Sequence, residues 1–282
     1  MLTETRDFTT EDLEYLRHDD RAMLLRLFRP AARGPHPVVV DLHGGAWTQG
    51  DMSQCDERGE ALARAGIAAA GLDFRHAEDG YPTSLVDINY AVRWLKANAA
   101  ELGLDAARVG LSGSSSGGHL AMLAAMRPAD ERYAAIPVPG ANVDARVQAV
   151  AMLWPVINPL SRYRYAKRLR DSENPPAWPA TIPDRHDIYW PDEAAMAEGN
   201  PMLALARGEA VATPPAVWIQ GRPDPIHDYL DIESGQDLNE PDRFAQNYRK
   251  AGGEIEIVDI EQAERPAQSL APLTDFFAKR LG

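Results

Sequence analysis

Residues 113–119, GSSSGGH, place three consecutive serines between glycines. A serine becomes an exposed nucleophile when it sits on a sharp turn between a strand and a helix, and the signature of that turn is G-x-S-x-G. The segment 113–117 fits the signature with Ser115 at its centre. Small neighbours let the backbone fold back on itself there. The spacing therefore predicts Ser115 as a nucleophile, with Ser114 and Ser116 at more tolerant positions.

A second segment suits the negative charge that acyl transfer builds on a carbonyl oxygen. The run PVVVDL is followed by HGGAW at 43–47, where glycines let backbone N–H groups approach a reacting atom. Losing one such donor costs roughly 3–4 kcal/mol of transition-state stabilisation. We assign this oxyanion hole to the amides of Gly45, Ala46 and Ser116, with Gly44 as a further candidate. His43 is interpreted as an anchor of the loop.

The sequence also predicts a sheet that can position these residues. Short β-branched runs alternate along the chain with segments of helical period. This alternation favours an α/β fold with a mostly parallel sheet covered by helices on both faces. Helical stripes are expected over 83–101 and 268–281. Strands are expected near 23–29, 37–42, 67–73, 107–112, 148–154, 215–220 and 254–260.

Length, net charge and hydropathy indicate how many domains the chain has and which partners it lacks. A length of 282 residues is compatible with one domain, 1–282, that carries an insertion. The net charge of -13 repels polyanions, so we expect no nucleic-acid partner. The amino terminus lacks the apolar core of a secretory signal, and no stretch approaches the ~20 apolar residues that span a bilayer. We therefore expect a cytoplasmic protein with no membrane partner.

Residues 155–213 depart from the alternation, since they hold prolines and aromatic residues without a clear strand signal. We expect a cap or lid over the site whose aromatic side chains shape an apolar pocket. The alternative is a satellite core. A basic cluster within the segment could attract an anionic substrate group, although a solvated helix face is the ordinary interpretation. It comprises Arg162, Arg164, Lys167, Arg168 and Arg170.

Several segments together resemble one family, the hormone-sensitive-lipase-like carboxylesterases of the α/β-hydrolase fold, with their feruloyl-esterase and arylformamidase relatives. They are HGGAW, DFRHAEDGYP at 73–82, GSSSGGHLA at 113–121 and DPIHD at 224–228. The resemblance covers most of the chain. It implies Ser115 as the nucleophile, Asp224 as the acid that orients a histidine, and a cap over the active site.

The sequence departs from that family near its carboxyl terminus. The family's catalytic histidine follows the last strand, but no histidine follows His227 here, and by register Arg265 takes the place. A guanidinium stays protonated and cannot accept the serine proton. His227 becomes the candidate base if its loop curls inward. The other candidates are His186, Glu261 and Glu264, or no base at all, with Asp224 then facing Arg265 as an ion pair.

Taken together, the sequence predicts a serine carboxylesterase that cleaves a small apolar acyl ester. Two alternatives stay open: a pseudoenzyme that binds a small molecule in the same pocket, and an amidase, formamidase or lyase with an altered base. We expect no cofactor and no metal, because neither a zinc-type spacing nor a nucleotide-binding loop is present. Substrate identity and oligomeric state are not encoded in any motif that we find.

Overall fold

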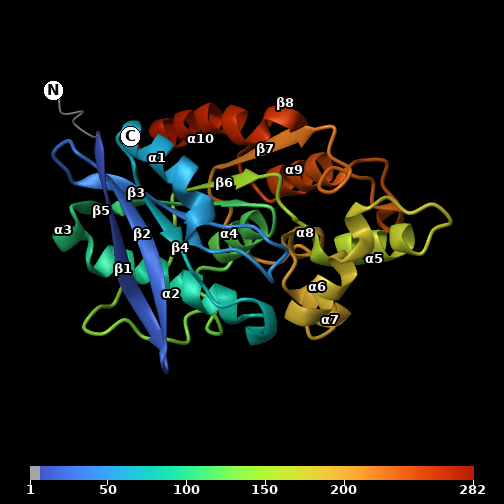
Figure 1. The fold of residues 1–282 in the computed structure, drawn as a ribbon, viewed down its shortest axis with the longest axis horizontal. Helices are drawn as coiled ribbons and strands as arrows, with labels where there is room; N and C mark the ends of the chain where they lie inside the picture. Colours follow the sequence, from blue (N-terminus) through green and yellow to red (C-terminus); the bar gives the residue numbers. More distant parts are fainter. Residues whose placement is uncertain (1–6) are drawn as a thin grey trace.

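The expected hydrophobic runs form the strands of one eight-stranded sheet, in the order β1-β2-β4-β3-β5-β6-β7-β8. The computed structural model describes residues 7–282 (Figure 1). The strands are β1 Phe8–His18, β2 Arg21–Pro30, β3 His36–Leu42, β4 Ala68–Leu72, β5 Leu104–Ser114, β6 Ala149–Leu153, β7 Ala216–Arg222 and β8 Ile255–Glu261. The expected α/β class is confirmed, since β3 to β8 pair in parallel.

The first strand was not predicted from the sequence. β1 pairs antiparallel with β2 at the sheet edge, and most of its side chains are exposed or half-buried. Its sequence FTTEDLEYLRH is therefore polar, and it offers no hydrophobic run of the kind that reveals a buried strand. Only occasional side chains such as Tyr15 reach the core.

Helices cover both faces of the sheet and bury a separate hydrophobic cluster on each. α1 and α10 lie on one face, and α2 and α4 on the other (Figure 1). Successive side chains of a strand point to opposite faces of the sheet, so each strand contributes to both clusters. In β3, Val38 and Val40 belong to one cluster and Val39 belongs to the other. The helices are α1 Asp56–Arg64, α2 Thr83–Ala97, α3 Ala99–Leu102, α4 Ser116–Met126, α5 Pro159–Arg170, α6 Ile182–Tyr189, α7 Glu193–Glu198, α8 Pro201–Ala206, α9 Glu240–Lys250 and α10 Arg265–Leu281.

The segment expected to form the cap lies between β6 and β7. It forms α5 to α8, and α5, α6 and α7 gather at the end of the molecule away from β1 (Figure 1). Tyr189 and Trp190 in this segment are at most 1% exposed. They pack with Trp47 and Tyr81 rather than facing a pocket, so these two aromatic residues follow the satellite-core alternative.

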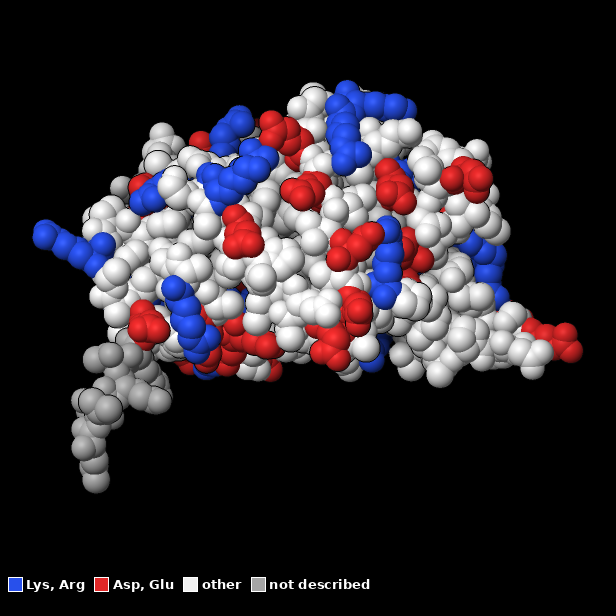
Figure 2. Space-filling model, turned by 90° about the horizontal axis from the view of Figure 1, so that it is seen from above, with Lys and Arg blue, Asp and Glu red and all other residues white. Residues whose placement is uncertain are grey.

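Charged side chains of both signs are distributed over the surface. On the face shown in Figure 2, lysines and arginines are interspersed with aspartates and glutamates. On this face the two signs of charge are therefore mixed. Within residues 7–282, no helix is both long enough and apolar enough to cross a bilayer.

Candidate active site

Ser115 sits between the end of β5 and the start of α4, in the turn that the sequence predicts. Its backbone has φ 52° and ψ -117°, a conformation that side chains other than glycine adopt only under strain. Its N–H donates to Leu153 at 2.9 Å, and its carbonyl accepts from Val156 at 3.0 Å. A side chain at Gly117 would lie 2.4 Å from the carbonyl oxygen of Leu42, so the helix can approach β3 only with glycine there.

The side chains of Ser115, His227 and Asp224 form a continuous hydrogen-bonded chain. Ser115 Oγ lies 3.0 Å from His227 Nε2, and His227 Nδ1 lies 2.8 Å from Asp224 Oδ2. A carboxylate only accepts, so His227 Nδ1–H is the donor and Nε2 is free to accept the serine proton. This is the geometry of a nucleophile, a base and an orienting acid.

The loop after β7 brings the acid and the base together over three residues. Asp224 Oδ1 accepts the backbone N–H of Ile226 at 3.0 Å and that of His227 at 3.3 Å. These bonds curl the loop into a turn, which directs the imidazole back toward Ser115. Asp224 also accepts from Gln220 at 3.4 Å. The carboxylate is therefore fixed by its own loop before it orients the histidine.

Burial and neighbouring charges set the protonation of this pair. Burial lowers the pKa of His227, and nearby Arg162 and Arg265 lower it further, while the hydrogen bond and negative charge of Asp224 partly oppose them. For Asp224, burial alone would raise the pKa, but the His227 hydrogen bond and positive neighbours hold it below its usual value. The histidine is thus neutral and the aspartate ionised near neutral pH, as a general base and its orienting acid require.

Arg265 lies beside the acid at the place where the sequence comparison expected a histidine. It is the first residue of α10, and its Nη1 lies 3.6 Å from Asp224 Oδ2. Its guanidinium also lies 4.6 Å from the ring centroid of Trp154. Asp224 therefore pairs with Arg265 and at the same time accepts the hydrogen bond of His227.

The other candidate bases lie elsewhere. His186 is fully buried, its ring contacts Trp47, and its Nδ1–H donates to the carbonyl of Ile182 at 2.9 Å. Burial lowers its pKa to about 3, which makes it a weak base. Glu261 and Glu264 are exposed, and neither carboxylate contacts Ser115 or His227. None of the three is placed to accept the serine proton.

The HGGAW loop lies against the nucleophile. A Cβ at Gly44 would lie 3.4 Å from Cβ of Ser115, and Gly44 and Gly45 line the cavity at the serine. Ala46, which the sequence suggested as a donor, is buried and does not line that cavity. The N–H of Ser116 is the first of α4 and lacks an acceptor within its own helix. Gly44 and Gly45 thus lie at the cavity, and the assignment of the oxyanion amides stays a prediction.

A cluster of aromatic and histidine side chains packs against the HGGAW loop. Trp47 Nε1–H donates to Nδ1 of His119 at 3.2 Å, and His119 Nε2–H donates to the carbonyl of Gly199 at 2.8 Å. Burial lowers the pKa of His119 to about 4, which keeps the ring neutral. His43 likewise has its pKa lowered to about 4 by burial and stacks on Phe74 at 4.3 Å. Both histidines therefore act as supports for the loop.

The cavity at Ser115 has a volume of about 430 Å³. Its walls carry charge as well as apolar surface, because Glu57, Arg58 and Arg265 line it beside Trp154. Arg58 is paired with the buried Asp41 at 2.7 Å. The cavity therefore has both charged and apolar walls.

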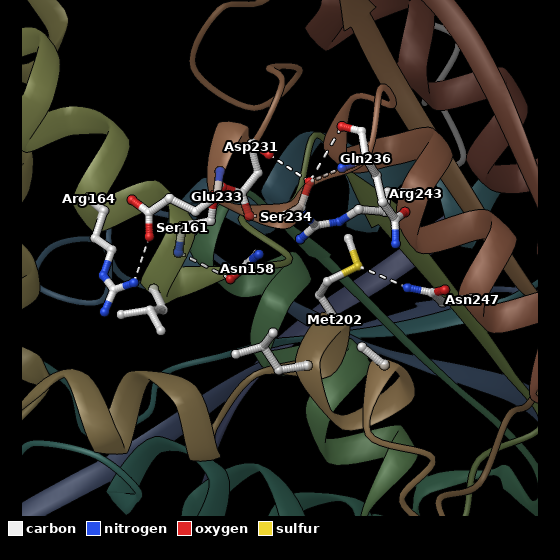
Figure 3. A pocket seen from close by; sticks show the side chains of 13 residues that line it. Asn158, Ser161, Arg164, Met202, Asp231, Glu233, Ser234, Gln236, Arg243 and Asn247 are labelled. Atoms are coloured by element: carbon white, nitrogen blue, oxygen red, sulfur yellow. Dashed lines mark hydrogen bonds and ion pairs between the residues drawn. The ribbon is translucent and has the colours of Figure 1, made fainter.

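A second cavity, of about 260 Å³, lies between α5, α8 and α9 and contains none of the expected site residues (Figure 3). Arg243 on α9 pairs there with Asp231 at 3.0 Å and with Glu240 at 3.2 Å. Asp231 ends the loop that carries Asp224 and His227, so its pair with Arg243 attaches that loop to α9. The second cavity thus belongs to the support of the candidate site.

Comparison with known proteins places the chain in a family. The family model described as BD-FAE matches residues 25–197, which is more than half of the chain and includes the HGGAW loop and the Ser115 turn. The chain belongs to the BD-FAE family. This BD-FAE chain is 30% identical over 204 residues to a probable carboxylic ester hydrolase, LipM, of Mycobacterium tuberculosis, covering 68% of this chain and 42% of that protein.

Other similar proteins cover more of their own length. An arylesterase of Saccharolobus solfataricus is 26% identical over 244 residues, which cover 82% of this chain and 72% of that protein. Among solved structures, the carboxylesterase EstE1, cloned from a metagenomic library, superposes with a TM-score of 0.74 at 19% identity, covering 97% of this chain and 90% of that chain. The α/β-hydrolase fold and the resemblance to esterases are thereby confirmed.

Two residues of the BD-FAE site were missed by sequence reasoning. Trp154 follows β6, lines the cavity and supports Arg265, but a tryptophan at the end of a strand reads as core. Arg58 reads as one more charge on a surface helix. The fold reveals that both residues line the cavity at Ser115.

Proposed function

We propose that this protein is a serine hydrolase that cleaves carboxylic esters of small acyl groups. The observation that carries the proposal is the hydrogen-bonded chain from Ser115 Oγ through His227 to Asp224, at 3.0 Å and 2.8 Å. The esterases among its relatives support the same reaction class. The base lies three residues after the acid instead of beyond the last strand.

In the proposed first step, Ser115 Oγ attacks the ester carbonyl while His227 Nε2 takes its proton. Asp224 holds the imidazole in the tautomer that accepts at Nε2 and stabilises the imidazolium that forms. The carbonyl oxygen becomes an oxyanion, which the amides of Gly44, Gly45 and Ser116 receive. His227 then returns the proton to the departing alcohol, which leaves an acyl group on Ser115.

The second step repeats the sequence with water in place of the alcohol. His227 takes a proton from the water, the hydroxide attacks the acyl carbon, and the acid leaves as Ser115 recovers its proton. Every proton transfer uses the same nitrogen of one imidazole. The strained backbone at Ser115 keeps the hydroxyl at one position through both steps.

We also propose that residues 155–213 act as a cap. The segment follows β6 directly, and its first residues are tied to the nucleophile by the bond from Val156 N–H to the Ser115 carbonyl. A cytoplasmic location and the lack of a cofactor, metal or nucleic-acid partner stay predictions from the sequence. The sequence and the fold carry no statement about oligomeric state.

The test is hydrolysis of p-nitrophenyl butyrate with mass analysis of the stalled enzyme. We expect turnover with an initial burst of p-nitrophenol and a butyryl mass on the peptide that contains Ser115. The Ser115→Ala protein should lack both. An acyl group on another residue, or turnover that survives Ser115→Ala, contradicts the proposal.

The alternatives give different results in the same assay. A pseudoenzyme would bind a substrate analogue without a burst in either protein. An amidase or formamidase would leave the ester intact but release aniline from an N-acyl anilide in a manner that depends on Ser115. The complete hydrogen-bonded chain favours acyl transfer over both a pseudoenzyme and a lyase.

A further inference from the structure

Arg162 on α5 is a buried arginine without a counter-ion. Its side chain is 3% exposed, and no carboxylate within the described part of the chain lies within ion-pair distance of it. Two of its nitrogens, Nε and Nη1, are shielded from solvent and have no hydrogen-bond partner. A guanidinium that is removed from water without a partner destabilises a fold, so its retention calls for a ligand.

The neighbouring arginines of α5 behave in the ordinary way. Arg164 pairs with Glu193 and Glu233, Arg168 with Glu233, and Arg170 with Asp184. All three are substantially exposed. The basic cluster is therefore a solvated, ion-paired helix face with Arg162 as its single inward member.

Contacts of the residues on either side of Arg162 place this part of α5 beside the candidate site. Tyr165, one turn later on α5, stacks on Tyr229 at 4.4 Å, two residues beyond His227. Tyr163 packs on His186, which in turn packs on Trp47 of the oxyanion loop. The turn of α5 that carries Arg162 thus packs against the loop that carries the base and, through His186, against Trp47 of the oxyanion loop.

A third contact involves the guanidinium itself. Trp178, in the short turn Trp178–Ala180, lies 5.8 Å from the guanidinium of Arg162 and 5.5 Å from Tyr165. Trp178 therefore covers the guanidinium from one side. Asp224, although close enough to interact with Arg162, already accepts from His227 and pairs with Arg265.

Arg162 keeps its charge in this environment. Burial lowers its pKa to about 10, which still leaves it protonated near neutral pH. Arg265 lies on the other side of Asp224, and its Nη1 is a second buried nitrogen without a hydrogen-bond partner. Asp224 is the counter-ion of Arg265, so the charge of Arg162 is the one of the two that no ion pair within residues 7–282 neutralises.

We propose that Arg162 binds a carboxylate of the substrate, and that the enzyme prefers esters that carry a carboxylate to neutral esters of the same size. The planar guanidinium presents paired N–H donors that match the two oxygens of a carboxylate. Such a ligand would satisfy the unpartnered nitrogens and neutralise the buried charge. This inference rests on the proposed ester hydrolysis and specifies its substrate class.

The first experiment compares kcat/KM for matched pairs of esters. One pair carries the charge on the acyl side, mono-p-nitrophenyl succinate against p-nitrophenyl butyrate. The other carries it on the alcohol side, 3-acetoxybenzoate against its methyl ester. We expect the anion to be preferred by about tenfold or more in one pair, as a charge-assisted hydrogen bond gives.

Variants then assign the preference to Arg162. Arg162→Met should lower the ratio of anionic to neutral kcat/KM to near one, and Arg162→Lys should retain part of it. Arg168→Met removes the same charge from the exposed face of α5, so it is the matched control and should leave the ratio unchanged. An equal loss of the ratio in the control would attribute it to long-range attraction and overturn the proposal.

Failure of this inference is distinguishable from failure of the proposed hydrolysis. Hydrolysis of all four esters through Ser115 with no preference for either anion overturns the role of Arg162 and leaves the hydrolase intact. If no ester is cleaved, calorimetry with Ser115→Ala and monoethyl succinate decides. Binding that Arg162→Met abolishes supports a carboxylate site, and binding no tighter than that of ethyl butyrate overturns it.

Discussion

His227 donates a hydrogen bond from Nδ1 to Asp224, three residues earlier on the same loop, at 2.8 Å. This short connection has a structural consequence, because one turn positions both the base and the acid. In the pattern inferred from the resemblance, acid and base come from separate loops. Here the first residue of α10, Arg265, lies beside the acid instead.

The three adjacent serines provide the first test. Ser115→Ala should lower kcat/KM for p-nitrophenyl acetate by about 10,000-fold or more, since loss of a triad nucleophile removes covalent catalysis. Ser114→Ala and Ser116→Ala should each cost less than about tenfold, because the role of Ser116 is that of a backbone amide, which alanine retains. Equal losses in the three variants would show that the nucleophile is misassigned.

Arg265 provides a test of how the base is tuned. Its charge lowers the pKa of His227, so Arg265→Gln should raise that pKa. The base acts when neutral, so kcat/KM is full above the pKa and falls as pH drops through it. In the wild type that fall lies below the ordinary histidine value of about 6.5, and the variant should move it to higher pH.

The pH profile of kcat/KM checks this shift, and Arg222→Gln, which removes an arginine paired with Asp228 and Asp259, is the matched control. An unshifted profile in Arg265→Gln would mean that the charge of Arg265 does not affect the pKa of His227.

Arg265→His, which would rebuild the family's pattern, should raise kcat/KM by less than about tenfold, because His227 already supplies the base.

Trp190 tests whether the aromatic residues of segment 155–213 belong to the core. The side chain is 1% exposed and packs against Trp47, Tyr81 and His119. Trp190→Ala should lower the free energy of unfolding by about 3–5 kcal/mol in urea denaturation. Ile188→Ala on the preceding helix, where the side chain is 45% exposed, should cost less than about 1 kcal/mol. A stable Trp190→Ala protein with altered ester chain-length preference would restore the pocket interpretation.

The sequence predicts the local parts of this site well. The Ser115 turn and the HGGAW loop depend on glycines next to each other in the chain, so their geometry is encoded in a few adjacent residues. The buried strands are likewise marked by their hydrophobic runs. β1 was not predicted, because most side chains of this edge strand are exposed and it has no hydrophobic run.

Parts that depend on distant contacts could not be predicted in the same way. Whether His227 reaches Ser115 depends on the curl of the Asp224 loop, which the attachment of Asp231 to Arg243 helps to fix. Arg162 has the same type and spacing as the exposed arginines around it, and only the packing of α5 against Tyr229 and His186 turns it inward. Which amides of the HGGAW loop face the cavity is likewise not revealed by the sequence.

The most direct test of the account is the rate of the His227→Ala protein. If His227 is the base, kcat/KM for p-nitrophenyl acetate at neutral pH should fall by about 10,000-fold or more, with the fold intact by circular dichroism. His186→Ala serves as the matched control, since its imidazole is buried against Trp47 and does not touch Ser115. A His227→Ala enzyme that keeps its rate within about tenfold of the wild type would contradict the account.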